Sequence, residues 1–386
     1  MKKKIAILGS TGSIGKSTLK IIQKDKKNFE VVLISGNDNY KEIIKQAKEF
    51  NVKNIQVNEN YINRVKNNIK KKVKVFSNKT NLKYILKGKI DYMMCAISGL
   101  VGLKSTLDSI KFSKKIGIAN KESIICGWSL INKELKKNKT QFIPIDSEHF
   151  SIWELTQKHK NHEIDQIILT ASGGPFLNKR ISDLKKVKSK DATKHPNWKM
   201  GKKISVNSAT LMNKFFEILE AYRMFDFDLN KYHILIHPQS YVHAIVKFKN
   251  GLTKILLHDT DMKIPISNSI YDFQVKNIKT KKINNKILNQ LSFLKVDKKR
   301  FPSIKMIKKI SKKNSLYDTI LTSSNEELVD LFLKNKISYN QIFHYFSKIL
   351  SLKEFNKYFN KKPLSIKQIY ALDKRVRLKT RSISVI

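Results

Sequence analysis

The strongest constraint on the fold is a glycine-rich turn close to the amino terminus. An apolar run at residues 5–8 is followed by the segment GSTGSIG at residues 9–15 and by an amphipathic stretch at residues 17–22. Strand, glycine turn and helix in this order form a phosphate site at a helix amino terminus. Gly9 permits the tight turn, Gly12 lets the backbone approach a pyrophosphate, and Gly15 allows close helix packing. The pattern favours a dinucleotide-binding unit, and a glycine turn used only for packing is the alternative.

Short apolar runs alternate with lysine-rich amphipathic segments over the first third of the chain. Further runs lie at residues 31–34, 55–57, 92–96 and 115–119. Buried strands that alternate with amphipathic helices are typical of βαβ units and a parallel sheet. We therefore expect a Rossmann-like amino-terminal domain.

Glycine placement separates the rest of the chain into two further regions. All 13 glycines lie at or before Gly251, and the apolar residues of segments 326–333 and 342–350 recur at spacings of three and four. This spacing predicts amphipathic helices in the glycine-free carboxyl-terminal region. Strand-like runs at residues 166–170, 233–236, 243–248 and 253–257 predict a mixed α+β region before it.

The expected fold is therefore α/β, with an amino-terminal Rossmann-like domain, a central α+β catalytic domain and a carboxyl-terminal all-α domain. The expected divisions are residues 1–146 for the nucleotide-binding domain and 147–273 for the catalytic and metal-binding domain, with a lid loop at about residues 188–201. Residues 274–300 are expected to form a linker, because they are rich in Lys and Asn, and residues 301–386 the helical domain.

Charge and composition narrow the classes of partner. The 77 basic and 31 acidic side chains give a net charge of +46, but the excess is spread along the chain and only seven of the basic residues are Arg. Arg is the residue that contacts phosphate and guanine with two parallel hydrogen bonds, so we expect no nucleic acid partner. The longest uncharged apolar run, residues 92–103, is much shorter than the roughly 20 residues that span a bilayer, so we expect no membrane partner.

The two cysteines, Cys95 and Cys126, are too few for a disulfide framework or a cysteine-based zinc site. Met1 and three lysines lead directly into the first predicted strand, which leaves no room for a signal or transit segment. We therefore expect a reducing, cytoplasmic location.

Two carboxylates close together suggest a metal site. Asp146 and Glu148 lie two residues apart, and an extended segment would place them on one face. Oxygen ligands of this kind suit Mg²⁺ or Mn²⁺, and Glu217, which shares a helical face with Asn213 and Lys214, is the candidate third ligand. The alternative is that Asp146 and Glu148 are surface charges or a helix cap.

Two segments resemble anion sites. Ser172 precedes two glycines directly after a predicted strand, and Ser208 is placed to cap the helix that contains Asn213 and Lys214. Together they indicate a phosphorylated substrate, whereas an ordinary turn and an ordinary cap are the alternatives. The segment from Lys194 to Gly201 lies between them and suits a lid over the substrate, and a structural loop with one buried Trp is the alternative.

The end of the second predicted strand bears on the cofactor. Asp38 can accept a hydrogen bond from the 2′-hydroxyl of NAD, and Lys41 can neutralise the 2′-phosphate of NADP. The residues alone do not choose between the two cofactors.

Taken together, these motifs resemble the 1-deoxy-D-xylulose 5-phosphate reductoisomerase family. They are residues 9–15, 119–123, 146–149, 171–176, 195–198 and 208–217, in the same order and spacing, and the likeness extends to residues 237–240, His243 and residues 324–326. The resemblance implies a homodimer that uses NADPH and Mg²⁺ or Mn²⁺ in isoprenoid precursor biosynthesis. The implied reaction rearranges a phosphorylated ketose and then delivers a hydride to give 2-C-methyl-D-erythritol 4-phosphate.

The resemblance also implies roles for individual residues. The metal would be bound by Asp146, Glu148 and Glu217. The substrate phosphate would be bound by Ser172, Ser208, Asn213, Lys214 and His195, and the substrate would be covered by Trp198. Ser147 and Lys121 would contact the reacting oxygens, and the catalytic set would be Lys121, Glu148, His149 and His237. The cofactor set would be Gly9, Ser10, Thr11, Gly12, Ser13, Ile14, Gly36, Asn37, Asn120, Glu122 and Gly201. The chain departs from the family at Asn37 and Asp38, where a basic residue is usual.

Other functions remain open at this stage. One is a metal-assisted NAD(P)-dependent dehydrogenase that leaves the carbon skeleton unchanged, and another is a nucleotide-sensing protein without chemistry. A basic nucleic-acid-binding protein is the third, and it predicts a steep salt dependence of binding.

Overall fold

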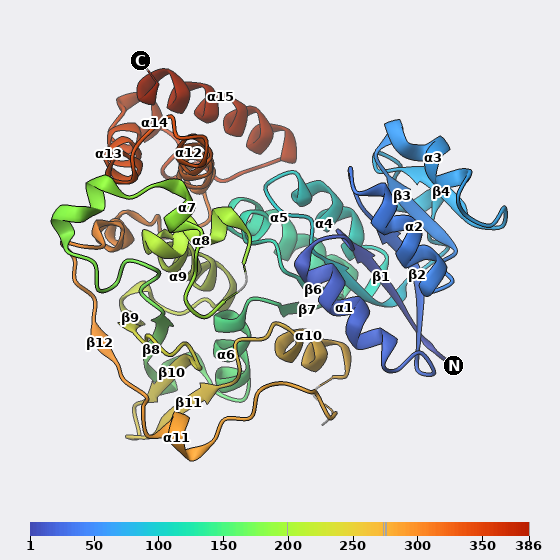
Figure 1. The fold of residues 1–386 in the computed structure, drawn as a ribbon, viewed down its shortest axis with the longest axis horizontal. Coiled ribbons are helices and arrows are strands. Elements are labelled where there is room, and N and C mark those ends of the chain that lie inside the picture. Colours follow the sequence, from blue (N-terminus) through green and yellow to red (C-terminus); the bar gives the residue numbers. More distant parts are fainter. Residues whose placement is uncertain (199, 273, 275, 386) are drawn as a thin grey trace. The chain divides into compact units, whose positions relative to one another are not determined.

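The computed structural model describes residues 1–198, 200–272, 274 and 276–385, so Lys199 of the predicted lid lies outside the described residues. Contacts between Cα atoms divide the chain into two compact units. The first comprises residues 1–123, 130–150 and 261–279, and the second comprises residues 124–129, 151–260 and 280–386. Figure 1 follows the elements of both units along the chain. Each unit is described by itself below.

The first unit contains a seven-stranded sheet in the order β4-β3-β2-β1-β5-β6-β7. All six neighbouring pairs are parallel, which confirms the predicted sheet. The strands are β1 (Lys3–Leu8), β2 (Phe29–Ser35), β3 (Asn54–Val57), β4 (Lys74–Ser77), β5 (Ile90–Cys95), β6 (Ser113–Ile118) and β7 (Gln141–Pro144). The strand order reverses direction at β1, so the glycine turn after β1 lies at the switch point where such sheets bind ligands.

Helices connect these strands. They are α1 (Ser13–Gln23), α2 (Tyr40–Glu49), α3 (Ile62–Lys66), α4 (Gly102–Ile110) and α5 (Lys121–Asn138), with short 3₁₀ turns η1 (Glu59–Tyr61) and η2 (Leu82–Tyr84). Strand residues such as Ile5 and Ile34 are fully buried against Leu19 and Ile22 of α1. A later helix, α10 (Lys263–Ile270), joins the same core through Ile266 and Ile270.

The second unit contains a five-stranded sheet in the order β11-β10-β8-β9-β12. Its strands are β8 (Ile164–Ala171), β9 (Tyr232–Ile236), β10 (Val242–Phe248), β11 (Thr253–Leu257) and β12 (Leu294–Lys295), and only the β8–β9 pair is parallel. The four strand-like runs predicted from the sequence are therefore confirmed. The helices are α7 (Ser189–Ala192), α8 (Lys202–Ala209), α9 (Met212–Phe225) and α11 (Asn285–Leu288), with 3₁₀ turns η3 (Asn161–Glu163), η4 (Ile181–Lys186), η5 (Leu229–Lys231) and η6 (Pro302–Lys309). Helix α6 (Ser147–Thr156) begins in the first unit and continues into the second from Ser151.

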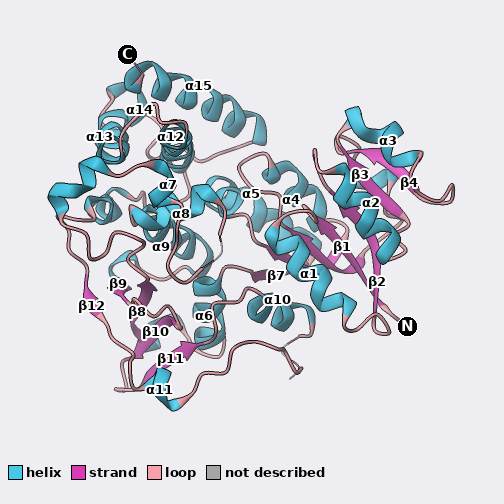
Figure 2. Ribbon diagram, viewed as in Figure 1, coloured by secondary structure: helices cyan, strands magenta, loops and turns pink. Residues whose placement is uncertain are grey.

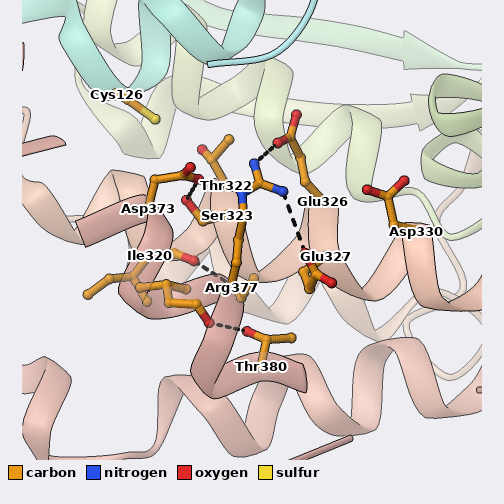
Figure 3. A network of polar contacts seen from close by, with 12 residues as sticks. Cys126, Ile320, Thr322, Ser323, Glu326, Glu327, Asp330, Asp373, Arg377 and Thr380 are labelled. Atoms are coloured by element: carbon orange, nitrogen blue, oxygen red, sulfur yellow. Dashed lines mark hydrogen bonds and ion pairs between the residues drawn. The ribbon is translucent and has the colours of Figure 1, made fainter. Parts of the chain in front are cut away.

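The carboxyl-terminal region is helical, as predicted. It comprises α12 (Leu316–Leu333), α13 (Tyr339–Leu350), α14 (Lys353–Asn356) and α15 (Ile366–Ser384), and Figure 2 shows no strand among these described residues. Polar contacts join α12 to α15: Arg377 pairs with Glu326, and Ser323 donates to Asp373 at 2.6 Å (Figure 3). Within α15, Arg377 also donates to Asp373 at 2.8 Å.

Among the described residues, no helix is both long and apolar enough to cross a membrane. The domain boundaries expected at residues 146, 273 and 300 stay a prediction. Within the expected linker, residues 285–288 form α11, and residues 294–295 form β12, an edge strand of the second sheet.

Candidate active site

Two glycines of the amino-terminal turn are required by packing, and one is not. Gly9 has φ of +83°, and a Cβ atom there would lie 2.5 Å from the carbonyl oxygen of Ala96. A Cβ on Gly15 would lie 2.4 Å from the carbonyl oxygen of Gly9. Around Gly12 the nearest atom would be 3.4 Å away, and this exposed residue begins α1 without a side-chain cap. The fold therefore explains Gly9 and Gly15, whereas Gly12 leaves room for an approaching ligand.

The neighbours of Gly12 divide into exposed and buried groups. Thr11, Ser13 and Ile14 are exposed or partly exposed beside it. Ser10 is buried: its N–H donates to the Ser35 carbonyl at 2.8 Å, and its hydroxyl donates to Gln46 at 2.7 Å. Ser10 therefore holds the turn together, and the exposed residues are the ones that a cofactor can reach.

The end of β2 presents an amide-rich surface. Asn37 donates to Asp38 at 2.8 Å and accepts from Asn78 at 3.0 Å, and Asn58 donates to the other oxygen of Asp38 at 3.1 Å. Both Asn37 and Asp38 are exposed, whereas Gly36 is buried, and a Cβ there would lie 2.9 Å from the Ile43 side chain.

Sequence reasoning missed a basic residue in this unit. The guanidinium of Arg64 lies 5.7 Å from the ring centre of Tyr40 and 5.8 Å from that of Tyr61, and the two rings stack 4.8 Å apart. Cations favour the faces of aromatic rings, so this arrangement orders the Arg64 side chain. The sequence does not indicate this contact, because Arg64 and Tyr40 lie 24 residues apart.

The amino terminus of α5 is held by Asn120. Its side chain accepts from the N–H of Ser123 at 2.7 Å, donates to the Gly99 carbonyl at 2.7 Å and also donates to the Ile97 carbonyl. The Lys121 ammonium lies 3.9 Å from a carboxylate oxygen of Asp146, and Glu122 is partly exposed in the first turn. The buried Asn120 therefore positions the two neighbouring side chains.

The expectation that Asp146 and Glu148 share a face of an extended segment is wrong. Strand β7 ends at Pro144 and α6 begins at Ser147, so Glu148 lies in the first helical turn. Asp146 accepts from the N–H of Glu148 at 3.1 Å, which is the geometry of a helix N-cap. The physical reason is that a cap by Asp satisfies an amide that an extended segment would leave exposed.

Two neighbours complete this helix start. The buried His149 has its Nδ1 atom 3.5 Å from Asp146, and the Ser147 hydroxyl donates to Glu148. One oxygen of the Asp146 carboxylate therefore caps α6, and the second oxygen lies 3.9 Å from the Lys121 ammonium.

In the second unit, Ser172 lies at the centre of a polar cluster. Its hydroxyl oxygen is 2.9 Å from Nε2 of His195 and 3.5 Å from the Ser208 hydroxyl, and it accepts from the N–H of Gly174 at 3.1 Å. The Nδ1 atom of His195 accepts from the backbone N–H groups of Asn197 and Trp198, so its proton is on Nε2 and points to Ser172. Burial lowers the pKa of His195 to about 4. The cluster thus offers several donors and no negative charge, which suits a phosphate group.

Ser208 does not cap the helix that contains Asn213 and Lys214, contrary to the prediction. It lies in the last turn of α8, and α9 begins after Leu211, whose φ of +58° turns the chain, without any side-chain cap. Tyr339 donates to the carbonyl of Ala209, the last residue of α8, at 2.6 Å, and Ser303 donates to the carbonyl of the following residue, Thr210, at 2.8 Å. These contacts fix the α8–α9 junction.

Asn213, Lys214 and Glu217 share one face of α9, as predicted. The Asn213 amide donates to one oxygen of Glu217 and the Lys214 ammonium pairs with the other. The side chains of Lys214 and Glu217 are only 4% and 2% exposed. Burying such a pair is costly, so a carboxylate held inside by two donors marks a functional site more than a source of stability.

The segment predicted to form a lid contacts the loop that follows β9 and strand β10. The Asn197 amide donates to the Pro238 carbonyl at 2.5 Å and to Ser240 at 2.9 Å, and the Trp198 ring meets the His243 ring edge-on with centres 5.9 Å apart. Gly201 is exposed, with nothing near its Cβ position. Sequence reasoning gave Asn197 no role.

His237 is held by the backbone through both ring nitrogens. Its Nδ1 donates to the Ser292 carbonyl at 2.9 Å, and its Nε2 accepts from the N–H of Tyr241 at 3.2 Å. Burial lowers the pKa of His237, which keeps the ring neutral. These contacts favour a positioning role over proton transfer.

Comparison with known proteins identifies the family to which the chain belongs. The model of the 1-deoxy-D-xylulose 5-phosphate reductoisomerase family matches residues 5–127. The model of the 1-deoxy-D-xylulose 5-phosphate reductoisomerase C-terminal domain matches residues 142–225, and the model of the DXP reductoisomerase C-terminal domain matches residues 257–379. The chain is 54% identical over 387 residues to the 1-deoxy-D-xylulose 5-phosphate reductoisomerase of Pelagibacter ubique, covering 99% of this chain and 100% of that one. The chain belongs to the 1-deoxy-D-xylulose 5-phosphate reductoisomerase family.

Solved structures of the family are similar over the whole length. The Zymomonas mobilis reductoisomerase in complex with NADPH has a TM-score of 0.91 and 30% identity, with 100% of this chain and 99% of that chain covered. A reductoisomerase in complex with NADPH, fosmidomycin and magnesium has a TM-score of 0.90 and 30% identity, with 98% of each chain covered. These matches confirm the predicted fold class, and the sequence departure from the family at Asn37 and Asp38 does not alter it.

Proposed function

We propose that the chain is an NADPH-dependent reductoisomerase that converts 1-deoxy-D-xylulose 5-phosphate to 2-C-methyl-D-erythritol 4-phosphate, an early step of isoprenoid precursor biosynthesis. The observation that supports this most is the 54% identity to a named reductoisomerase along essentially the entire chain. The polar cluster around Ser172 and the buried face of α9 supply the phosphate and carboxylate chemistry that this reaction needs.

We further propose that Asp146, Glu148 and Glu217 hold Mg²⁺ or Mn²⁺. Each of the three side chains supplies carboxylate oxygens that can serve as metal ligands. The donor set fits, because Mg²⁺ and Mn²⁺ prefer hard oxygen ligands and leave further positions for substrate oxygens. When bound, the ion supplies Lewis-acid stabilisation of negative charge on the substrate oxygens.

The substrate phosphate is assigned to the cluster in the second unit. His195 donates its Nε2 proton to Ser172, which frees the Ser172 hydroxyl proton for a ligand oxygen. Ser208, Asn213 and Lys214 add two neutral donors and one charge. Binding energy from a phosphate remote from the reacting carbons can be used to close the site and to exclude water.

Other residues contact or position the reacting groups in this proposal. Lys121 and Ser147 donate to the substrate oxygens, and His149 holds the start of α6 against Asp146. His237 orients the loop after β9 through its two backbone contacts. Trp198 covers the substrate, which keeps the aldehyde product of the first step from leaving.

The cofactor is assigned to the glycine turn of the first unit. Gly12 and its exposed neighbours Thr11, Ser13 and Ile14 bind the pyrophosphate, and Gly36 and Asn37 lie at the ribose end, in keeping with the strand order. Asn120, Glu122 and Gly201 complete the proposed set, and Gly9 and Ser10 support it from within. Lys41 and Arg64 are the basic groups that we propose for the 2′-phosphate.

We also propose that the enzyme works as a homodimer in the cytoplasm, with no nucleic acid and no membrane partner. The predicted division into residues 1–146, 147–273, 274–300 and 301–386 is part of this proposal. The free, buried thiols of Cys95 and Cys126 are in keeping with a reducing compartment.

The reaction itself tests the proposal. The protein is incubated with 1-deoxy-D-xylulose 5-phosphate, NADPH and Mg²⁺ while NADPH absorbance is followed and the product is identified by ¹³C NMR. We expect one NADPH consumed for each product molecule with a quaternary, methyl-bearing carbon. Consumption of NADPH without that carbon would support a simple dehydrogenase, and NADPH binding without consumption would support a nucleotide sensor.

A further inference from the structure

A buried ion pair joins α9 to α12, and its α9 member lies six residues beyond Glu217. The Arg223 guanidinium makes two parallel contacts with Asp318 of α12, at 3.0 and 2.9 Å. It also donates to the carbonyl and the hydroxyl of Ser311, at 3.0 Å each. The side chains of Arg223 and Asp318 are 2% and 0% exposed. The helix with the proposed metal ligand is therefore tied rigidly to the start of α12.

Asn314 connects the Asp318 carboxylate to a third helix, α5. The Asn314 amide donates to Asp318 at 2.8 Å and to the Ile125 carbonyl at 2.8 Å, and its oxygen accepts from the N–H of Ser129 at 3.0 Å. In a regular helix the carbonyl of residue 125 bonds to the N–H of residue 129. The Asn314 side chain therefore bonds to both members of a hydrogen-bond pair in the middle of α5.

This chain of contacts reaches two helices that contain proposed site residues. At one end, α9 contains Asn213, Lys214 and Glu217. At the other end, Ile125 lies one helical turn after Lys121 in α5. Every link in the chain, Arg223, Asp318, Asn314, Ile125 and Ser129, lies within the second compact unit.

Stability alone is a poor explanation for this arrangement. A buried ion pair often contributes no more to stability than well-packed apolar side chains would, because both charges lose their hydration. What a fully bonded pair supplies is one defined geometry, since each donor and acceptor has a fixed direction. Catalysis depends on such geometry, and a misplacement of about 1 Å can lower a rate about 100-fold.

We propose that Arg223, Asp318 and Asn314 are positioning residues for the reaction, which fix the face of α9 that presents Asn213, Lys214 and Glu217 and the middle of α5. The proposal rests on the assignment of Glu217 as a metal ligand. None of the three residues is expected to touch substrate or cofactor.

Asp318→Asn tests the proposal, because it keeps the size of the side chain and removes the charge that Arg223 binds. Asp373→Asn is the matched control: Asp373 also accepts from an Arg and a Ser, but within α12 and α15 only (Figure 3). For the wild type and both variants we would measure the Kd for Mn²⁺ by EPR, kcat, and the unfolding temperature. We expect Asp318→Asn to weaken Mn²⁺ binding and to lower kcat by about 10- to 100-fold, and Asp373→Asn to change neither by more than about twofold while it lowers the unfolding temperature.

Equal Mn²⁺ affinity and equal kcat in the two variants would overturn the proposal, whatever their stability. If Asp318→Asn does not fold, Arg223→Lys decides the question by the same measurements, because it keeps the charge but loses the paired contact. Glu217→Gln separates this proposal from the function on which it rests. Normal Mn²⁺ affinity in Glu217→Gln would remove the metal assignment, whereas lost affinity there together with normal affinity in Asp318→Asn would remove only the positioning role.

Discussion

Replacing Gly12 by alanine should weaken NADPH binding and leave the stability of the fold almost unchanged. The backbone of Gly12, with φ of −77° and ψ of 174°, is one that alanine adopts, and its Cβ would meet no atom closer than 3.4 Å. Loss of glycine at a helix N-cap costs about 0.5–1 kcal/mol, and the lower entropy of the unfolded chain offsets about 0.4–1 kcal/mol of that cost. The free energy of unfolding should therefore change by less than about 0.5 kcal/mol.

The expected loss is in affinity, because the added methyl group occupies the space that the pyrophosphate needs. We expect the Kd for NADPH to rise about tenfold, which corresponds to about 1.4 kcal/mol. Fluorescence titration with NADPH measures the affinity, and denaturant unfolding measures the stability. An unchanged Kd for NADPH in Gly12→Ala would refute the reasoning, since the turn would then serve packing alone.

Gly15→Ala is the matched control for this prediction. Its Cβ would lie 2.4 Å from the Gly9 carbonyl oxygen and 2.5 Å from Cα of Ser10, both backbone atoms. Moving these atoms apart costs typically 1–3 kcal/mol, and the better helix propensity of alanine offsets up to about 1 kcal/mol of that cost. We expect a net loss of about 1–2 kcal/mol in the free energy of unfolding together with weaker NADPH binding.

Three further substitutions test single contacts. Lys214→Ala should raise KM for the phosphorylated substrate far more than KM for NADPH, and equal effects would argue against a phosphate role. Burial lowers the pKa of His195 to about 4, below the usual value of 6.5, so the unfolded chain binds a proton first and stability is lost as pH falls from about 6.5 to 4. His195→Asn should make that decline shallower in denaturant unfolding, and an unchanged slope would contradict the pKa assignment. Asn120→Asp keeps the acceptor for Ser123 but loses both donors, and should cost about 1–3 kcal/mol of unfolding free energy.

Local patterns predicted the elements of this fold well. Apolar runs at residues 5–8 and 253–257 are strands, and spacings of three and four gave the helices of the carboxyl-terminal region. The order of the strands in the two sheets was not predicted, because pairing joins segments far apart in the sequence and a single sequence holds no record of it. Packing of α10 against the core of the first sheet was missed for the same reason.

The candidate site shows the same division between local and distant contacts. The shared face of Asn213, Lys214 and Glu217 follows from helix geometry and was predicted. The extended geometry at Asp146 and the cap at Ser208 were wrong, because each depended on where a helix begins, which is the least certain feature of a sequence pattern. The contact between Ser172 and His195 could not be predicted as a hydrogen bond, although both residues were assigned to phosphate.

No pattern in the sequence predicted the contacts of Arg223. Its partner Asp318 lies 95 residues away, and neither residue belongs to a recognisable motif. Only the folded chain brings these two charges together, with Asn314 beside them.

The central claim is that carboxylates from two separate segments of the chain serve one metal ion. Equilibrium titration with Mn²⁺, read by EPR, tests it most directly when the wild type is compared with Asp146→Asn and with Glu217→Gln. The account predicts one tight Mn²⁺ ion per chain in the wild type and loss of that same ion in each variant. Retention of the tight ion in either variant would contradict it.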